Sequence, residues 1–290
     1  MQTQTATMPA AFLGHGSPMN ALEINRYSQA WQAFGASIPR PRAILAISAH
    51  WYTQVSAVTA MERPRTIHDF YGFPQELFDV EYGAPGDPGV AEEVAEVVKP
   101  DVVGLDRDSW GLDHGTWSVL VHAFPKADVP VLQLAIDERR TLDQHLQLGA
   151  RLQKLRERGV LILGSGNIVH NLRAMSWAQP DAAFDWNRRF DDATRECLTE
   201  RPAEVAKLLE HPDYRRAAPT PDHFLPMVYL AGLAAAEGHG LRVLIDGYAY
   251  GSLSMTSYLL DAARPQGMDD KRPAAPLPNP AKIPPEDTNT

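Results

Sequence analysis

Short, almost wholly apolar runs alternate along this chain with segments of helical periodicity. The apolar runs predict strands at 10–13, 43–48, 55–60, 131–136, 160–163 and 241–245. The helical patterns predict helices at 28–34, 90–98, 142–158, 184–199, 203–209 and 224–235. Strands without polar alternation are typical of a sheet that is covered on both faces. We therefore expect one α/β domain, with a central, mostly parallel or mixed sheet flanked by helices on both faces.

The C-terminal part of the chain differs in composition from the rest. Residues 248–258 fit a further strand near the sheet edge, although their periodicity does not settle this. From Arg264 onward the chain is rich in Pro, Ala, Asp and Lys and has almost no large apolar residues. Such a segment buries too little surface to offset its chain entropy. We expect a folded domain over residues 1–263 and a Pro-rich disordered tail over 264–290.

Charge and cysteine content exclude several classes of function. The formal net charge is -9 and the arginines are scattered, so a phosphate backbone would be repelled and nucleic acid is not an expected partner. No apolar stretch reaches the ~18 residues of a membrane span. Cys197 is the single cysteine, which rules out an intrachain disulfide and fits a reducing, cytoplasmic location. Any metal must therefore be held by histidine, carboxylate or carbonyl groups.

Three histidines follow predicted strands. His15 comes directly after the first strand, His50 lies just beyond the second, and His170 lies shortly after the strand at 160–163. In an open α/β sheet, the carboxyl ends of the strands converge on the crevice where ligands bind. Histidines in that position can meet in space despite their wide separation in sequence. Because neutral imidazole is a common ligand of zinc and iron, their convergence predicts a metal site.

Two further histidines have informative surroundings. His114 is paired with Asp113 between Gly111 and Gly115, in a segment whose glycines favour a loop and whose carboxylate influences the imidazole proton. His223 follows Asp222, which we expect to cap the next helix and so to place His223 in its first turn.

Each of these signals also has a simpler structural interpretation. A histidine after a strand is often a hydrogen-bonded structural residue, and glycines around His114 are typical of a tight turn. The turn at 164–167 resembles a phosphate-binding loop, but no lysine follows it and its glycine spacing fits no nucleotide signature. The pattern Gly-x-Ser-x-Gly of a serine nucleophile is absent. The aromatic segment 66–74 either lines a pocket for a planar substrate or packs over the sheet.

Taken together, seven segments in order along the chain resemble the class III (LigB-type) extradiol ring-cleavage dioxygenases, in the branch called 4,5-DOPA extradiol dioxygenase-like. The matching segments are LGHGSPMNAL (13–22), ISAHWYT (47–53), TIHDFYGFP (66–74), GLDHGTW (111–117), GSGNIVHNL (164–172), HFL (223–225) and GSLSM (251–255). The resemblance covers almost the whole chain before the tail. It implies that residues 1–263 form the catalytic domain of an enzyme that inserts O2 into a catechol, of the DOPA type.

The resemblance also implies roles for individual residues. His15, His50, His170 and His223 correspond to the ligands of one divalent metal, either Zn(II) or non-haem Fe(II). His114 corresponds to a histidine at the substrate and is the expected acid or base. A catalyst needs an open coordination position, so we expect His170 to alternate between weak ligation and acid–base duty.

Two other functions use the same residues. A zinc hydrolase would act through a metal-bound hydroxide, with His114 as its proton shuttle. A non-catalytic metal-binding protein on the same fold is a second alternative, against which the presence of all five histidines argues. The sequence fits a monomer or a small homo-oligomer equally well.

Overall fold

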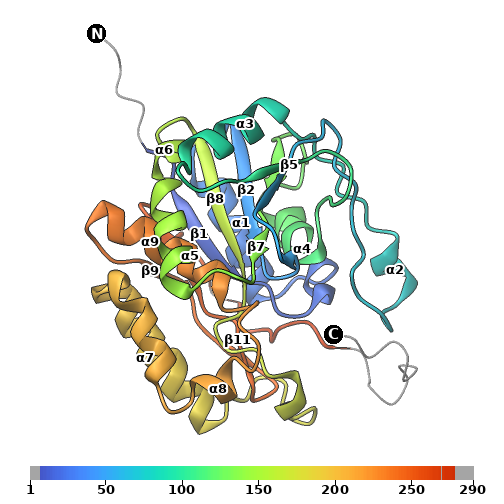
Figure 1. Cartoon of the computed structure of the whole chain (residues 1–290). Helices are drawn as coiled ribbons and strands as arrows, with labels where there is room; N and C mark the ends of the chain where they lie inside the picture. The colour runs from blue at the N-terminus through green and yellow to red at the C-terminus, as the bar shows by residue number, and fades with distance from the viewer. Residues whose placement is uncertain (1–6, 269, 278–290) are drawn as a thin grey trace.

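Figure 1 shows the computed structural model, which describes residues 7–268 and 270–277. At its centre lies a six-stranded sheet in the order β6-β2-β8-β1-β12-β9. Its strands are β1 (Ala10–Gly14), β2 (Ala43–Ser48), β6 (Val131–Gln133), β8 (Val160–Gly166), β9 (Arg242–Ile245) and β12 (Ser257–Leu260). The first four in spatial order are parallel, β12 is antiparallel to β1, and β9 is antiparallel to β12. The predicted mixed, mostly parallel sheet is confirmed.

Helices surround this sheet. The longer ones are α1 (Arg26–Ser37), α3 (Pro88–Val97), α4 (His114–Ala123), α5 (Leu142–Arg151), α7 (Asp185–Glu200) and α9 (Leu225–Glu237). Shorter elements are α2 (Gln75–Phe78), α6 (Gln153–Arg156), α8 (Tyr214–Ala217) and the 3-10 helices η1 (Pro18–Ala21), η2 (Leu172–Ala174) and η3 (Pro202–Glu210). None of the helices built from described residues has the length and apolar character that crossing a membrane requires.

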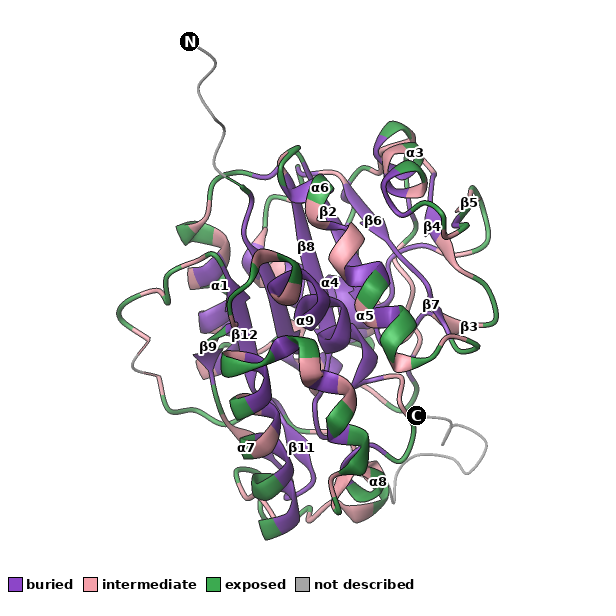
Figure 2. Ribbon diagram, turned by 60° about the vertical axis from the view of Figure 1, so that its left-hand side comes forward, coloured by how far each residue is buried: buried purple, intermediate pink, exposed green. Residues whose placement is uncertain are grey.

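Two apolar cores lie on opposite faces of the sheet. Along a strand, successive side chains point to opposite faces. Phe12 of β1 accordingly belongs to the core that includes residues of α3, α5 and α9, whereas the adjacent Leu13 belongs to the core that includes Trp31 of α1 and Trp117 of α4. The central strands are buried throughout, as their colour in Figure 2 shows. Helices on both faces of a single domain are therefore confirmed, and burial on both sides explains why these strands are continuously apolar.

Local sequence fixes the ends of several helices. Asn25 and Ser28 form a reciprocal capping box at the start of α1, and Thr141 and Gln144 form another at the start of α5. Such caps satisfy backbone N–H groups that have no partner within the helix. The predicted helix at 142–158 is divided, since Leu152 separates α5 from α6.

Three predicted strands differ in their pairing. The run 131–136 divides into β6 and β7 (Ile136–Asp137), and β7 pairs with β3 (Tyr52–Thr53) outside the main sheet. The run 55–60 contains β4 (Ala57–Thr59), which pairs with β5 (Gly104–Asp106). The run 248–258 forms the hairpin of β10 (Tyr248–Ala249) and β11 (Leu253–Ser254) and then enters β12. β12 lies directly beside the edge strand β9, which agrees with the predicted position near the sheet edge.

The described part of the C-terminal segment packs against the domain. Ala275 is fully buried, and its backbone N–H donates to Oδ1 of Asn20 over 2.9 Å. Ser17 donates to the Pro276 carbonyl, and the Leu277 N–H donates to the Tyr250 hydroxyl. The predicted disorder from residue 264 is therefore wrong for 270–277, whose backbone forms bonds that composition does not encode. The prediction of disorder also covers residues 278–290, which lie outside the described residues.

A buried histidine between α5 and α9 makes stability depend on pH. His145 is 1% exposed and its Nδ1 lies 2.9 Å from the Tyr229 hydroxyl. Burial, followed by the charge of Arg140, lowers the pKa of His145 to about 4. The unfolded chain therefore takes up this proton first, so the stability that the neutral ring contributes is present above pH ~6.5 and is lost as the pH falls toward 4.

We expect His145→Gln, which retains a polar group but does not titrate, to remove part of this pH dependence. A shift of that size corresponds to about 3 kcal/mol at most between neutral pH and pH 4. Urea unfolding followed by circular dichroism at several pH values measures the difference, with the exposed His239→Gln as the control. Parallel stability curves for the variant and the unmodified protein would contradict this role of His145.

Candidate metal centre

The carboxyl ends of two parallel strands, β1 and β2, bring histidines together. β1 ends at Gly14 and is followed directly by His15, and His50 lies two residues beyond the end of β2. Nε2 of His15 and Nε2 of His50 lie 3.3 Å apart. The convergence predicted from strand topology is therefore present in the structure.

His223 and His170 complete the cluster from a second direction. The His223 ring lies 5.4 Å from that of His15 and 5.0 Å from that of His50, centroid to centroid. His170 stacks on His223 at 3.5 Å with nearly parallel planes. The structure therefore brings all four of these histidines into one cluster.

Asp222 does not cap the helix that follows, contrary to the expectation from sequence. Helix α9 begins at Leu225, its N-cap residue is Phe224, and no side chain caps it. The Asp222 carboxylate instead makes a short contact with Nδ1 of His223. Interaction with the imidazole, which outweighs the opposing effect of burial, lowers the pKa of Asp222. His223 therefore precedes α9, held by its neighbouring carboxylate.

His114 lies at the start of a helix that local propensity did not indicate. It is the first residue of α4, whose N-cap is Asp113. Its ring centroid lies 3.9 Å from that of His50. His15, His50 and His114 each offer a ligand atom within 4.8 Å of the other two. By geometry alone, His114 therefore qualifies as a potential metal ligand together with His15 and His50.

Burial and mutual proximity favour neutral imidazole rings. Burial, reinforced by neighbouring histidines, lowers the pKa of His15 well below its ordinary value, and the same causes lower the pKa of His50. Burial and His223 likewise lower the pKa of His170. Neutral imidazole is the form that binds a metal. His15, His50 and His170 are therefore favoured in the neutral, ligating form at neutral pH.

A hydrogen-bond chain fixes which nitrogen of His15 is free. The Ser165 hydroxyl donates its only proton to the Gly115 carbonyl over 2.5 Å. It therefore accepts from Nδ1–H of His15, which lies 3.0 Å away. Nε2 of His15 is left without a proton and faces His50. A neutral imidazole whose other ring nitrogen donates a hydrogen bond in this way is a suitable ligand for a divalent metal of the zinc or iron type.

Asp69 is a residue of this centre that no pattern in the sequence singled out. Its Oδ2 lies 3.0 Å from Nδ1 of His114 and 3.2 Å from Nδ1 of His50. Its Oδ1 accepts a hydrogen bond from the backbone N–H of His114. Burial opposes the charged forms of both partners, but their mutual attraction prevails: the pKa of Asp69 is lowered and that of His114 is raised.

A second buried carboxylate, that of Asp113, links the segments that carry His50 and His114. Asp113 accepts from the Ser48 hydroxyl and the Thr116 backbone N–H and contacts the Gln133 amide. Burial, with the nearby charge of Asp69, raises the pKa of Asp113 to about 6. These contacts connect the end of β2 to the start of α4 and so fix His114 relative to His50.

An aromatic cluster adjoins His114. Phe70 is buried and its ring meets His114 edge to face at 5.5 Å. Phe73, Phe78 and Trp117 pack around Phe70, with centroids 5.2, 4.9 and 6.1 Å away. The segment 66–74 therefore both packs over the fold and supplies an aromatic side to the histidine cluster.

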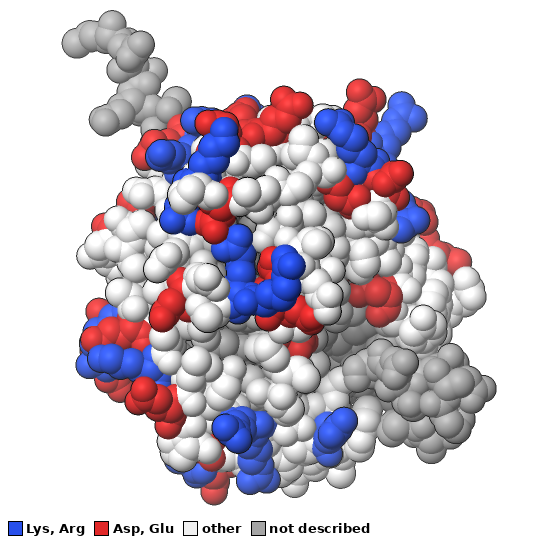
Figure 3. Space-filling model, viewed as in Figure 1, with Lys and Arg blue, Asp and Glu red and all other residues white. Residues whose placement is uncertain are grey.

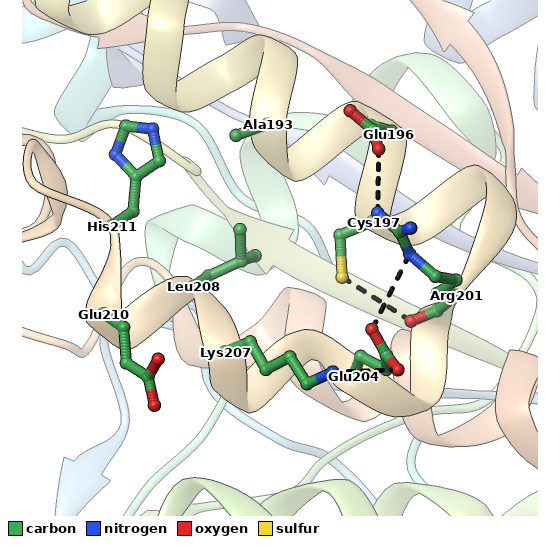
Figure 4. Close-up of a pocket in the computed structure, with 9 residues that line it drawn as sticks. All are labelled: Ala193, Glu196, Cys197, Arg201, Glu204, Lys207, Leu208, Glu210 and His211. Atoms are coloured by element: carbon green, nitrogen blue, oxygen red, sulfur yellow. Dashed lines mark hydrogen bonds and ion pairs between the residues drawn. The ribbon is translucent and has the colours of Figure 1, made fainter.

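A surface pocket of about 340 Å³ lies away from the histidine cluster, between α7 and η3 (Figure 4). Arg201 pairs with Glu196 and Glu204 beside it, and the Cys197 thiol contacts the Arg201 carbonyl. Burial raises the pKa of Cys197 to about 11, so the thiol is protonated at neutral pH. Arg201 and Lys207 of this pocket are paired with its glutamates Glu196 and Glu204, and we assign the pocket no chemical role.

Charges of both signs are mixed on the face shown in Figure 3, where blue side chains mostly lie beside red ones. Asp101, for example, pairs with both Arg140 and Arg151, and Glu93 pairs with Arg42 and Arg158. In each of these clusters one carboxylate pairs with two arginines, so charges of both signs lie together and one positive charge is left over.

The glycine after His114 is required by a close approach. A Cβ at Gly115 would lie 2.5 Å from Oγ of Ser48 and 2.8 Å from Cδ2 of His50. We expect Gly115→Ala to displace the His50 ring and to weaken metal binding by ~10–100-fold, the range for lost support of a ligand. Crowding of the buried Ser48 opposes the ~1 kcal/mol by which helix propensity favours alanine, so the loss of metal affinity should exceed any change in stability. Chelator competition and thermal unfolding, with Gly89→Ala in α3 as the control, measure both; unchanged affinity would refute the expectation.

Comparison with known proteins agrees with this geometry. Residues 10–260 match the family described as the catalytic LigB subunit of aromatic ring-opening dioxygenase. The chain is 44% identical over 255 residues to the 4,5-DOPA dioxygenase extradiol of Escherichia coli strain K12, covering 86% of this chain and 93% of the relative. It is 34% identical to the protein of that name from Beta vulgaris, covering 85% and 94%.

A solved structure shows the same fold. The crystal structure of an uncharacterized protein from Escherichia coli K12 matches with a TM-score of 0.76 and 39% identity, covering 87% of this chain and 99% of the other. Family, relatives and fold coincide over the region that carries the five histidines. The chain therefore belongs to the LigB family and is an enzyme of the extradiol aromatic ring-opening dioxygenase type.

Proposed function

We propose that this enzyme inserts both atoms of O2 into a substituted catechol of the DOPA type and opens the ring beside, rather than between, the two hydroxyls. The observation that carries the proposal is the convergence of five histidines at the carboxyl end of the sheet, with Nε2 of His15 3.3 Å from Nε2 of His50. Membership of the LigB family supports the reaction type, and the names of the relatives support the substrate class.

One divalent metal would be held by His15, His50 and His223, with His170 as a fourth, exchangeable ligand. The metal supplies positive charge that lowers the pKa of the catechol hydroxyls and, as Fe(II), an electron source for O2. We propose Fe(II) for turnover, because Zn(II) is redox-inert. Zn(II) would still occupy such a site in purified protein, since nitrogen ligands bind it tightly.

The other residues bind and move protons. His114 would accept a catechol proton, since imidazole exchanges protons near neutral pH and Asp69 stabilises its protonated form. Phe70 would bound the ring of the substrate on the side of His114. His170, stacked on His223 and partly exposed, would leave the metal when substrate binds and assist proton transfer.

The single cysteine supports a proposal for the cellular compartment. A cytoplasmic, reducing compartment suits Fe(II) chemistry in an enzyme whose single cysteine is a buried free thiol. We propose that it acts there as a monomer or small homo-oligomer, without nucleic acid or membrane as partner.

The test is anaerobic reconstitution of the metal-stripped protein with Fe(II) or with Zn(II), followed by DOPA and air-saturated buffer. Oxygen consumption equal to substrate loss, together with a new yellow ring-opened product in the Fe(II) form, would support the proposal. Absence of oxygen uptake with every catechol tested, accompanied by ester or amide hydrolysis in the Zn(II) form, would replace it by the zinc hydrolase.

The role of His170 has its own structural test. In a complex with a catechol analogue, we propose that His170 lies off the metal. Retention of all four histidines as ligands in that complex would contradict this role.

A further inference from the structure

We propose that Asp69 is the positioning residue that holds His50 and His114 in the same tautomer, with the proton on Nδ1 and Nε2 left free. The proposal rests on the function proposed above, in which His50 is a metal ligand and His114 an acid or base. Asp69 contacts both rings, so one carboxylate would orient the ligand and the acid or base together.

The geometry of the carboxylate carries this inference. A single oxygen, Oδ2, lies 3.2 Å from Nδ1 of His50 and 3.0 Å from Nδ1 of His114. An ionised carboxylate oxygen only accepts hydrogen bonds, so a lone pair on either Nδ1 would face it repulsively. Both are close carboxylate–imidazole contacts rather than formal hydrogen bonds. Both nevertheless favour the proton on Nδ1.

The second carboxylate oxygen prevents rotation. Oδ1 accepts the backbone N–H of His114 over 2.9 Å, at the first residue of α4. The orientation of Asp69 is thus fixed to the helix that carries one of its two partners. The Asp69 side chain is 18% exposed and the His114 side chain is 7% exposed, so little water competes for these contacts.

The consequence for the ligand is direct. Nε2 of His50 faces Nε2 of His15. The hydrogen bonds of Ser165 leave Nε2 of His15 without a proton, as Asp69 does for Nε2 of His50. Two independent supports, a hydroxyl for His15 and a carboxylate for His50, therefore present two unprotonated nitrogens to the same point. Ligating histidines commonly donate their other N–H to such a partner, and its loss costs ~10–100-fold in metal affinity.

Asparagine at position 69 would create a conflict that smaller residues avoid. If the amide oxygen keeps the bond from the His114 backbone, the NH2 group faces both Nδ1 atoms and requires them to accept. If the amide turns over, the NH2 group faces the backbone N–H instead. Either orientation opposes donor to donor, as an alanine does not. We therefore expect Asp69→Asn to damage the site more than Asp69→Ala, although asparagine is the closer match in shape.

The test uses Zn(II) alone as the probe and needs no turnover. Chelator competition on Asp69→Asn, Asp69→Ala and Asp69→Glu gives the affinities, with the surface variant Asp128→Asn as the matched control. Nitrogen-15 NMR of histidine-labelled, metal-free protein reports which ring nitrogen carries the proton. Circular dichroism verifies that each variant is folded.

We expect a ~10–100-fold loss of Zn(II) affinity in Asp69→Asn, a smaller loss in Asp69→Ala, and partial recovery in Asp69→Glu. Two of the ring signals should move from the Nδ1–H to the Nε2–H form in Asp69→Asn. Equal or greater loss in Asp69→Ala, or unchanged tautomers in Asp69→Asn, would overturn the proposal in favour of a purely structural role. If the NMR and affinity results hold while no catechol is cleaved, the tautomer role stands and the proposed reaction fails.

Discussion

Replacing His15 by alanine is expected to remove the metal from the protein and to abolish oxygen uptake with every catechol. The His15 ring lies 5.1, 5.8 and 5.4 Å from the rings of His50, His114 and His223, centroid to centroid. It is 1% exposed and its free nitrogen faces His50. Losing a ligand should therefore cost more than the ~10–100-fold that losing an outer partner of a ligand costs. Metal analysis after gel filtration and oxygen electrode traces measure both effects.

The exposed variant His239→Ala is the control for His15→Ala, since it removes a histidine outside the cluster. The fold should survive in both, because His15 follows a strand whose apolar residues remain in the core. Full metal content and activity in folded His15→Ala would show that the metal binds elsewhere.

Replacing His114 by phenylalanine is expected to leave the metal in place and to lower kcat by ~10²–10⁴-fold, the range for loss of a positioned acid or base. Phenylalanine keeps an aromatic ring against Phe70 but carries no proton. The structure places His114 close enough to be counted with the potential ligands, so this variant separates the two roles. Metal analysis together with steady-state kinetics in the Fe(II) form distinguishes them.

A metal-free His114→Phe protein would make His114 a ligand and contradict its assignment as acid or base. Unchanged kcat with full metal content would remove it from catalysis altogether. Phe70→Leu is the matched control: it alters the aromatic neighbour of His114 while leaving every imidazole in place, and should change kcat less than His114→Phe.

The arrangement of the histidines was predictable because strand topology links local pattern to position. His15 and His50 each follow a continuously apolar run, and parallel strands end at the same edge of a sheet. The two faces of the sheet were predictable for the same reason. A strand whose residues are all apolar has apolar side chains on both faces of the sheet, and helices must cover both faces to bury them.

Helix α4 could not be predicted, because tertiary contacts rather than helix propensity require its one glycine, Gly115. Gly115 lowers helix propensity, yet Ser48 and His50 leave no room for a Cβ there. Asp69 was missed because its partners His50 and His114 are 19 and 45 positions away along the chain and only the fold brings them together. Its place in the segment 66–74, which carries the family resemblance, was the one available signal.

The packing of residues 270–277 was unpredictable in a different way. Ala274 and Ala275 are small, so composition gives them little weight, yet both are buried. Their segment is held through backbone groups that bond to Ser17, Asn20 and Tyr250. Backbone bonding of this kind has no signature in composition.

The measurement that bears most directly on the proposed reaction is isotopic labelling with ¹⁸O2. The Fe(II) enzyme would turn over DOPA in ordinary water under ¹⁸O2, with the aldehyde reduced at once to retain its label, and the product would be analysed by mass spectrometry. We expect one labelled oxygen in the new carboxylate and one in the reduced aldehyde, since both atoms of O2 enter the substrate without an external reductant. A ring-opened product without label from ¹⁸O2, whose new oxygen comes from water, would contradict the dioxygenase reaction.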